Sequence, residues 1–137
     1  MLVASRYPNH PAPLWNLPGG RQRDGELLDQ TLRREFLEET GLTIERDRFL
    51  YLSESYDRKT GTHFVNVTFS VRSGGEPKAA LDDAHIVGLE WVPRDEVTAR
   101  MSVAVVREPL AAYLRGEGKS YFGFDDAGIT IEFSDPA

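Results

Sequence analysis

Three glutamates crowd the end of one helix-forming segment, and this cluster limits the fold and chemistry of the chain more than any other feature. Residues 27–40 contain no proline or glycine and are mostly good helix formers, so they predict a helix that Gly41 ends. On that helix Glu35, Glu38 and Glu39 project within an arc of about 100°. Carboxylates about 5 to 6 Å apart repel by about 3 kcal/mol per pair at an effective dielectric of about 20. Something must therefore offset the repulsion.

Two explanations compete for this acidic cluster. Solvent together with Arg33 and Arg34 could neutralise it, which is the ordinary fate of a charged helix face. A hard divalent cation, which prefers oxygen ligands, is the alternative. Spacing alone favours the solvated face.

Neighbouring residues shift the balance towards the cation. Leu28, Leu32 and Phe36 lie beside the carboxylates on the helical wheel, so the acidic arc borders the buried side and is expected to line a cleft. The glycine pair at residues 19–20 precedes the helix, and exposed glycine backbone can approach a ligand closely.

Around this segment the hydrophobic pattern predicts a mixture of strands and helices. Pro109 falls inside the last predicted helix, so that helix is either kinked or starts only near Glu108. The predicted elements are strands at 2–5, 49–55, 63–72 and 86–92, helices at 94–101 and 103–115, and a closing hairpin over 121–133 whose turn is 125–128. Such a mixture in a chain of 137 residues predicts one α/β or α+β layered domain spanning residues 1–137.

Composition excludes several classes of protein. The chain has no cysteine, so disulfides, zinc-thiolate sites and cysteine nucleophiles are excluded. A formal net charge of −6 argues against a protein that grips duplex nucleic acid. No apolar run is long enough to cross a membrane, and the N-terminus lacks a secretory apolar core, so a cytoplasmic location is expected.

The segment from Gly20 to Leu42 resembles the Nudix box, G-x5-E-x7-R-E-U-x-E-E-x-G-U, where U is apolar. The lead-in WNLPGG, which starts at Trp15, is also similar to the approach usual in the family. The match covers every specified position: Gly20, Glu26, Arg34, Glu35, Phe36, Glu38, Glu39, Gly41 and Leu42.

The resemblance implies a Nudix α/β/α sandwich with a mixed central sheet. Family members commonly carry a strand before the one predicted at 2–5, and the sequence shows none there. Either the segment 128–133 fills that position, or a partner covers the edge, or the chain starts late. An exposed edge invites pairing, so a homodimer is a further expectation.

The resemblance also implies a catalytic metal site for Mg²⁺, with Mn²⁺ as a substitute. Glu38 and Glu39 would be the principal ligands, and Glu35 would be a further ligand or would activate water. Arg34 would orient the glutamates by ion pairing. Two residues complete the set: the Gly19 carbonyl would bind the metal, and Glu26 would support the loop or bind an outer metal.

Several residues outside this core are candidates for substrate binding. The family often places an extra acidic residue near the metal, and Asp82 and Asp83 are the candidates, although each alone reads more simply as a solvated acid. For each of the others a purely structural role is the simpler reading. They are Tyr56, which could stack on a base, His63, which could contact phosphate or the leaving group, and Arg6, Arg21 and Arg23, which could meet phosphates.

Three functions are compatible with this pattern. The first is a Mg²⁺-dependent pyrophosphohydrolase acting on a nucleoside diphosphate derivative such as ADP-ribose, a nucleotide sugar or a dinucleoside polyphosphate. The second is a nucleotide-pool-cleansing enzyme that acts on an oxidised dNTP of the 8-oxo-dGTP kind. The third is a Nudix-like sensor that binds a nucleotide without cutting it, which Glu35, Glu38 and Glu39 make less attractive because a pure binder has no need of them.

Overall fold

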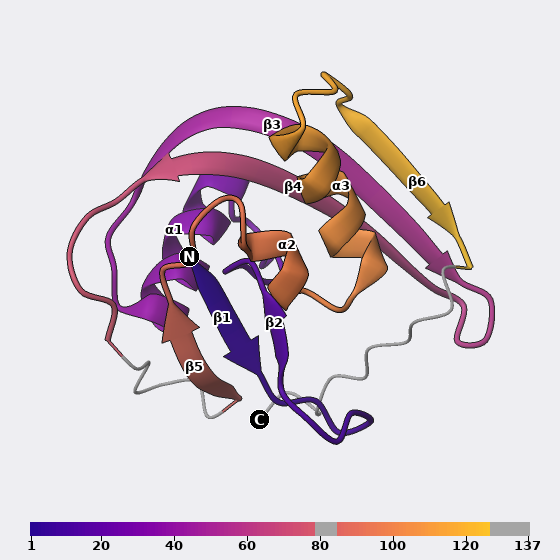
Figure 1. The fold of residues 1–137 in the computed structure, drawn as a ribbon, viewed down its shortest axis with the longest axis horizontal. Coiled ribbons are helices and arrows are strands. Elements are labelled where there is room, and N and C mark those ends of the chain that lie inside the picture. The colour runs from indigo at the N-terminus through magenta and orange to yellow at the C-terminus, as the bar shows by residue number, and fades with distance from the viewer. Residues whose placement is uncertain (79–84, 127–137) are drawn as a thin grey trace.

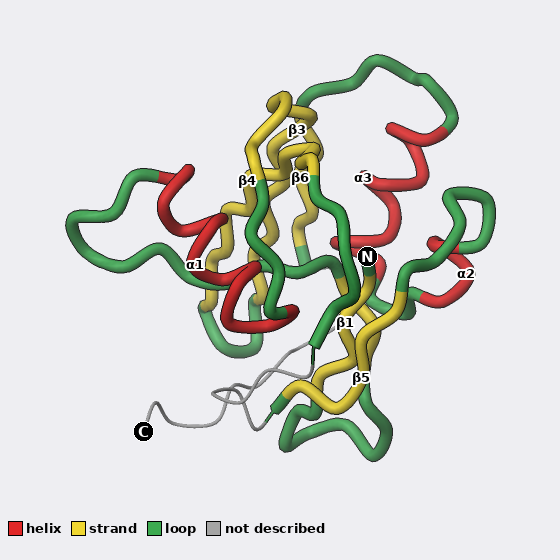
Figure 2. Tube along the Cα trace, turned by 90° about the vertical axis from the view of Figure 1, so that its left-hand side faces the viewer, coloured by secondary structure: helices red, strands yellow, loops and turns green. Residues whose placement is uncertain are grey.

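The fold is an α/β/α arrangement of two sheets between helices. The structure, a computed structural model, describes residues 1–78 and 85–126. Figure 2 shows α1 (Leu28–Thr40) on one side of the strands, with α2 (Val97–Arg100) and α3 (Ala104–Leu114) on the other. The predicted sandwich is thereby confirmed. None of the helices in the described ranges is long and apolar enough to span a membrane.

Within the described residues the strands form two three-stranded sheets (Figure 1). The first has the order β2-β1-β5 and is antiparallel, with β1 at Leu2–Ser5, β2 at Leu14–Asn16 and β5 at Ile86–Glu90. The second has the order β4-β3-β6, with β3 at Glu45–Asp57, β4 at Thr62–Arg72 and β6 at Tyr121–Asp125. It is mixed, because β3 pairs antiparallel with β4 and parallel with β6.

Two apolar clusters hold the layers together. Leu2, Val97, Met101 and Leu110 form the first cluster, which joins β1 to α2 and α3. Phe36, Leu42 and Ile44 form the second, with partly buried Leu32, Val71 and Met1 packed on it. The second cluster fixes α1 against the start of β3 and the end of β4. It therefore sets where the acidic residues of α1 lie.

Both ends of α1 have an identifiable cause. The backbone amide of Leu27 donates to Gln30 Oε1 over 2.7 Å, which supplies half of a capping box although the leucine side chain has no acceptor of its own. At the other end Gly41 takes a left-handed φ of 73°, and its amide donates to the Leu37 carbonyl over 2.8 Å. The helix predicted at 27–40 is therefore confirmed to within one residue.

The other predicted strands and helices agree with the structure in part. The hairpin of β3 and β4 is confirmed, although β3 starts earlier than predicted, at Glu45. The strand β2 was not predicted, and α2 has one turn where a longer helix was expected. A start for α3 near Glu108 is wrong, because the helix begins at Ala104 and continues through buried Pro109. Of the closing hairpin, β6 is confirmed, whereas residues 128–133 lie outside the described residues.

Candidate active site

The guanidinium group of Arg34 joins three of the box glutamates. Its Nε donates to Glu26 Oε2 over 2.7 Å and its Nη2 to Glu26 Oε1 over 2.9 Å, which is a bidentate pair. Its Nη1 lies 2.7 Å from Glu35 Oε1 and 3.3 Å from Glu38 Oε2. The Nη2 group also donates to the carbonyl of Arg21 over 2.9 Å. Arg34 is therefore ion-paired to these glutamates, and the orienting role that the resemblance implies stays a prediction.

Glu26 is surrounded by donors. Besides Arg34, its Oε1 accepts from the backbone amide of Arg23 over 2.8 Å and from the hydroxyl of Thr31 over 3.1 Å. The bond from Arg34 is the main cause that lowers the pKa of Glu26 from 4.5 to about 2, followed by the Arg23 amide. The same pair raises the pKa of Arg34. These contacts favour the loop-supporting role for Glu26 over an outer metal.

The remaining carboxylates are held near the glycine loop. Glu39 is buried, with 6% exposure, and its Oε1 accepts from the backbone amide of Gly19 over 2.7 Å. The carboxylate of Glu35 packs against Gly20, where an added Cβ would lie 2.3 Å from Glu35 Cδ. Loop and helix are thus fitted to each other at both glycines.

This cluster suits a divalent cation by its chemistry. Three carboxylates, those of Glu26, Glu35 and Glu38, share the bonds of Arg34, and Arg23 Nη2 lies 3.8 Å from Glu38 Oε1. The cluster therefore carries more negative than positive charge, and its donor atoms are carboxylate oxygens. Mg²⁺ and Mn²⁺ bind to sites of this kind. Within residues 1–78 and 85–126 no three acidic or histidine side chains already converge as a ligand set. The glutamate side chains would have to converge further to receive a metal.

The loop arginines differ in how they meet the cluster. Arg23 reaches Glu38, as described, with a side chain that is 65% exposed. Arg21 supplies its carbonyl to Arg34. Arg6 is exposed just after β1, where its backbone amide donates to the His85 carbonyl over 2.9 Å. The structure thus brings Arg21 and Arg23 to the acidic cluster, while Arg6 is held at the junction of β1 with the segment before β5.

Tyr56 and His63 lie away from the acidic cluster. They pair across β3 and β4 with ring centroids 6.0 Å apart, and His63 Nε2 lies 2.9 Å from Glu54 Oε2. The start of β3 is beside α1, where Arg46 Nε donates to Asp29 Oδ1 over 2.9 Å. At about 3.3 Å per residue, Tyr56 is about 30 Å further along the strand. Asp82 and Asp83 lie outside the described residues.

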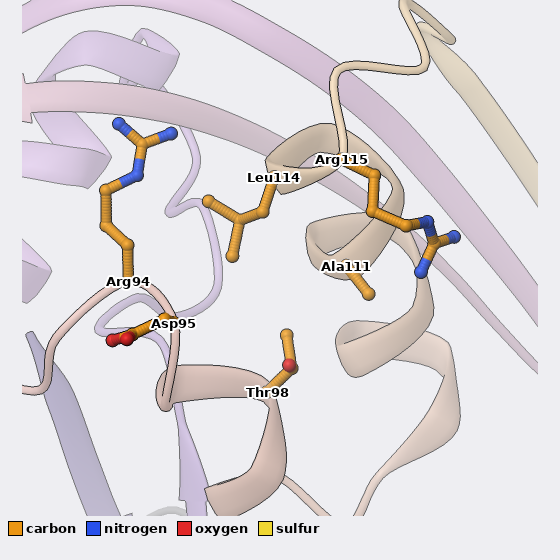
Figure 3. Close-up of a pocket in the computed structure, with 6 residues that line it drawn as sticks. All are labelled: Arg94, Asp95, Thr98, Ala111, Leu114 and Arg115. Carbon is orange, nitrogen blue, oxygen red and sulfur yellow. The ribbon is translucent and has the colours of Figure 1, made fainter.

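A pocket opens between α2 and α3 (Figure 3). These two helices lie on the other side of the strands from α1 (Figure 2). The volume of the pocket is about 340 Å³. Six residues line it: Arg94, Asp95, Thr98, Ala111, Leu114 and Arg115. The two guanidinium groups point away from each other in Figure 3, and Arg115 is held by Glu117 Oε2 over 2.6 Å. The pocket therefore does not offer a pair of converging cations.

Sequence reasoning missed two features of this site. Thr31 reads as an ordinary helix residue, yet its buried hydroxyl contacts Glu26. Position 20 has no room for a side chain because the carboxylate of Glu35, fifteen positions along the chain, packs against Gly20. A polar residue on the buried side of the helix was the available signal for Thr31.

Gly20→Ala is expected to lower kcat by about a hundredfold with little loss of stability. The new Cβ would lie 2.5 Å from both carboxylate oxygens of Glu35, and this flexible group would be pushed from Arg34. Steady-state kinetics and thermal unfolding measure the two effects. Gly74→Ala is the matched control, because nothing lies within 4 Å of its added Cβ. Unchanged kcat in Gly20→Ala would contradict the role given to Glu35.

Acid is expected to remove the stabilisation that Glu26 provides. Its pKa is about 2 in the folded chain against 4.5 ordinarily, so unfolding favours proton uptake in this window. The contribution is complete above about pH 4.5 and is lost as the pH falls towards about 2. Urea unfolding of wild type and Glu26→Gln should therefore show a stability difference that shrinks over this range. A difference that stays constant with pH would contradict the assignment.

Comparison with known proteins agrees with this geometry. A family model described as the NUDIX domain matches residues 1–114. A putative 8-oxo-dGTP diphosphatase of Bacillus subtilis (strain 168) is 35% identical over 80 residues, which are 58% of this chain and 50% of that protein. An ADP-ribose pyrophosphatase of Methanocaldococcus jannaschii is 32% identical over 97 residues, which are 69% of this chain and 57% of that protein. The chain thus spans about half the length of these curated relatives.

A solved structure shows the same fold. The NUDIX hydrolase from Nitrosomonas europaea superposes with a TM-score of 0.70 at 24% identity, covering 87% of this chain and 82% of that one. At this identity the likeness concerns the arrangement of helices and strands alone.

Proposed function

The chain belongs to the NUDIX family, and from this we propose that it hydrolyses the pyrophosphate bond of a nucleoside diphosphate derivative with the help of Mg²⁺. Mn²⁺ is the expected substitute. The observation that carries the proposal is that the Arg34 guanidinium group holds Glu35 and Glu38, while the amide of Gly19 in the glycine loop holds Glu39. The carboxylates supply hard oxygen donors, and Arg34 and the Gly19 amide hold them in position.

Each residue of the cluster has a distinct role in this proposal. Glu38 and Glu39 would hold the metal, and Glu35 would hold it or take the proton from the attacking water. A bound divalent cation would neutralise the diphosphate, polarise phosphorus and lower the pKa of a coordinated water. Arg34 keeps the carboxylates apart and oriented while Glu26 fixes Arg34. The Gly19 amide fixes Glu39, and this leaves its carbonyl as the candidate backbone ligand.

A second substrate class also has support. Relatives from Bacillus subtilis and Buchnera aphidicola carry names that contain 8-oxo-dGTP diphosphatase, whereas the Methanocaldococcus jannaschii relative is named for ADP-ribose. The aligned stretch is longest for the ADP-ribose relative, at 69% of this chain. We therefore place nucleoside diphosphate derivatives first and oxidised dNTPs second.

A substrate panel tests the proposal. Purified protein with Mg²⁺ or Mn²⁺ is given ADP-ribose, a nucleotide sugar, a dinucleoside polyphosphate and 8-oxo-dGTP, and products are separated by phosphorus NMR. ADP-ribose should yield AMP and ribose 5-phosphate, whereas 8-oxo-dGTP would yield the monophosphate and pyrophosphate. Chelation of the metal should abolish turnover. If none of these compounds is cut, the sensor hypothesis replaces the enzyme.

The proposal includes a homodimer. Among the described strands β4 is an edge of its sheet, and Val65 on β4 is 56% exposed. An edge of this length without proline or lysine invites pairing with a second copy. Light scattering coupled to size-exclusion chromatography measures the mass in solution, and a monomer at all concentrations would refute the dimer.

A further inference from the structure

The hydroxyl group of Thr31 lies within hydrogen-bond distance of two acceptors. Its side chain belongs to a residue that is 6% exposed, and its Oγ1 lies 3.1 Å from Glu26 Oε1 and 3.3 Å from the Leu27 carbonyl. Threonine in a helix ordinarily donates to the carbonyl four residues earlier, which here is Leu27. The hydroxyl has one proton, and the charged carboxylate is both nearer and the stronger acceptor.

Among the described residues, that hydroxyl is one of three donors to Oε1 of Glu26. A carboxylate has about four acceptor positions. Arg34 takes one on each oxygen, through Nε on Oε2 and Nη2 on Oε1. The Arg23 amide and the Thr31 hydroxyl also reach Oε1. Without the hydroxyl, Oε1 would keep the Arg23 amide of the loop and the long side chain of Arg34, and it would lose its donor on a short side chain of the helix.

The position of Glu26 in turn decides the position of Arg34. The guanidinium group is planar, so the two bonds to Glu26 set its plane and direct Nη1 at Glu35 and Glu38. We infer that Thr31 is a positioning residue whose hydroxyl holds Glu26, and through Arg34 fixes the geometry of the glutamates that would bind the metal. The inference rests on the proposed function for its effect on metal affinity, and on the contacts alone for its effect on Arg34.

Thr31→Val and Thr31→Ser separate the hydroxyl from the methyl group. Valine keeps the shape and removes the donor, whereas serine keeps the donor and removes the methyl. We expect Thr31→Val to raise the Mn²⁺ dissociation constant about tenfold and to lower kcat about tenfold, with KM within about twofold. Thr31→Ser should restore both to within about threefold of wild type. Mn²⁺ binding is measured by electron paramagnetic resonance without substrate.

A measurement without metal isolates the contact itself. The Nε–H resonance of Arg34, assigned by its loss in Arg34→Lys, reports the bond to Glu26. In Thr31→Val this proton should exchange with water at least about threefold faster than in wild type, and in Thr31→Ser it should exchange as in wild type. A merely structural threonine would alter thermal unfolding and leave this proton unchanged. If Thr31→Val does not fold, Thr31→Ala removes the same donor without filling the site.

The outcomes distinguish the two claims. Wild-type Mn²⁺ affinity and Arg34 exchange in Thr31→Val overturn the inference, and so does equal damage from Val and Ser, which would indicate packing by the methyl group. If wild-type protein binds no Mn²⁺ and cuts no substrate, the proposed function fails. Proton exchange of Arg34 then still decides the positioning role.

Discussion

Glu38→Gln and Glu39→Gln are each expected to lower kcat by at least about a hundredfold while the fold survives. Glutamine has nearly the size of glutamate but carries no charge, so each variant replaces one anionic ligand of the proposed metal site by a neutral, weaker one. At Glu39 the amide oxygen can still accept from Gly19, and at Glu38 the side chain is 35% exposed. Neither change therefore opens a cavity. Steady-state kinetics at saturating substrate and Mg²⁺ measure the loss.

Glu45→Gln is the matched control for these variants. Glu45 is an exposed carboxylate at the start of β3, outside the acidic cluster. Its kcat should equal that of wild type. The melting temperature of all three variants should stay within about 4 °C of wild type. Wild-type turnover in both Glu38→Gln and Glu39→Gln would refute the assignment of these residues as metal ligands.

Arg34→Ala is expected to lower the melting temperature by about 10 °C and to abolish measurable turnover. Its side chain is 17% exposed, and its loss leaves the carboxylates of Glu26 and Glu35 without their nearest cation. The repulsion that the sequence pattern predicts would then be uncompensated within the apo protein. Calorimetry and steady-state kinetics measure the two effects.

Arg34→Lys distinguishes charge from shape. Lysine keeps the charge but cannot form the bidentate bond to Glu26 and also reach Glu35. It should recover about half of the lost melting temperature, with kcat still at least about tenfold below wild type. Excess Mg²⁺ should partly restore the melting temperature of Arg34→Ala, because a bound cation screens the same carboxylates. Full activity in Arg34→Lys would show that only the charge matters.

The sequence by itself determined the parts of the protein whose cause is local. Helix α1 was predictable because its apolar spacing, its lack of breakers and Gly41 act within a few residues. The gathering of Glu35, Glu38 and Glu39 on one side followed from helix geometry alone. The hairpin of β3 and β4 was predictable from alternation on either side of a turn. These features need no knowledge of distant contacts.

Tertiary structure decided what depends on segments far apart in the chain. The bond from Gly19 to Glu39 and the fit of Gly20 against Glu35 join a loop to the far end of the helix that follows it. The parallel pairing of β6 with β3 unites strands from the two halves of the chain, and it has no signature in either strand. Tyr56 was a candidate for stacking on a base, yet the length of β3 carries it to the other end of the sheet. The spacing of residues along a helix or strand determines the face on which each side chain lies. Only the packing of the helices and strands determines which residues that face contacts.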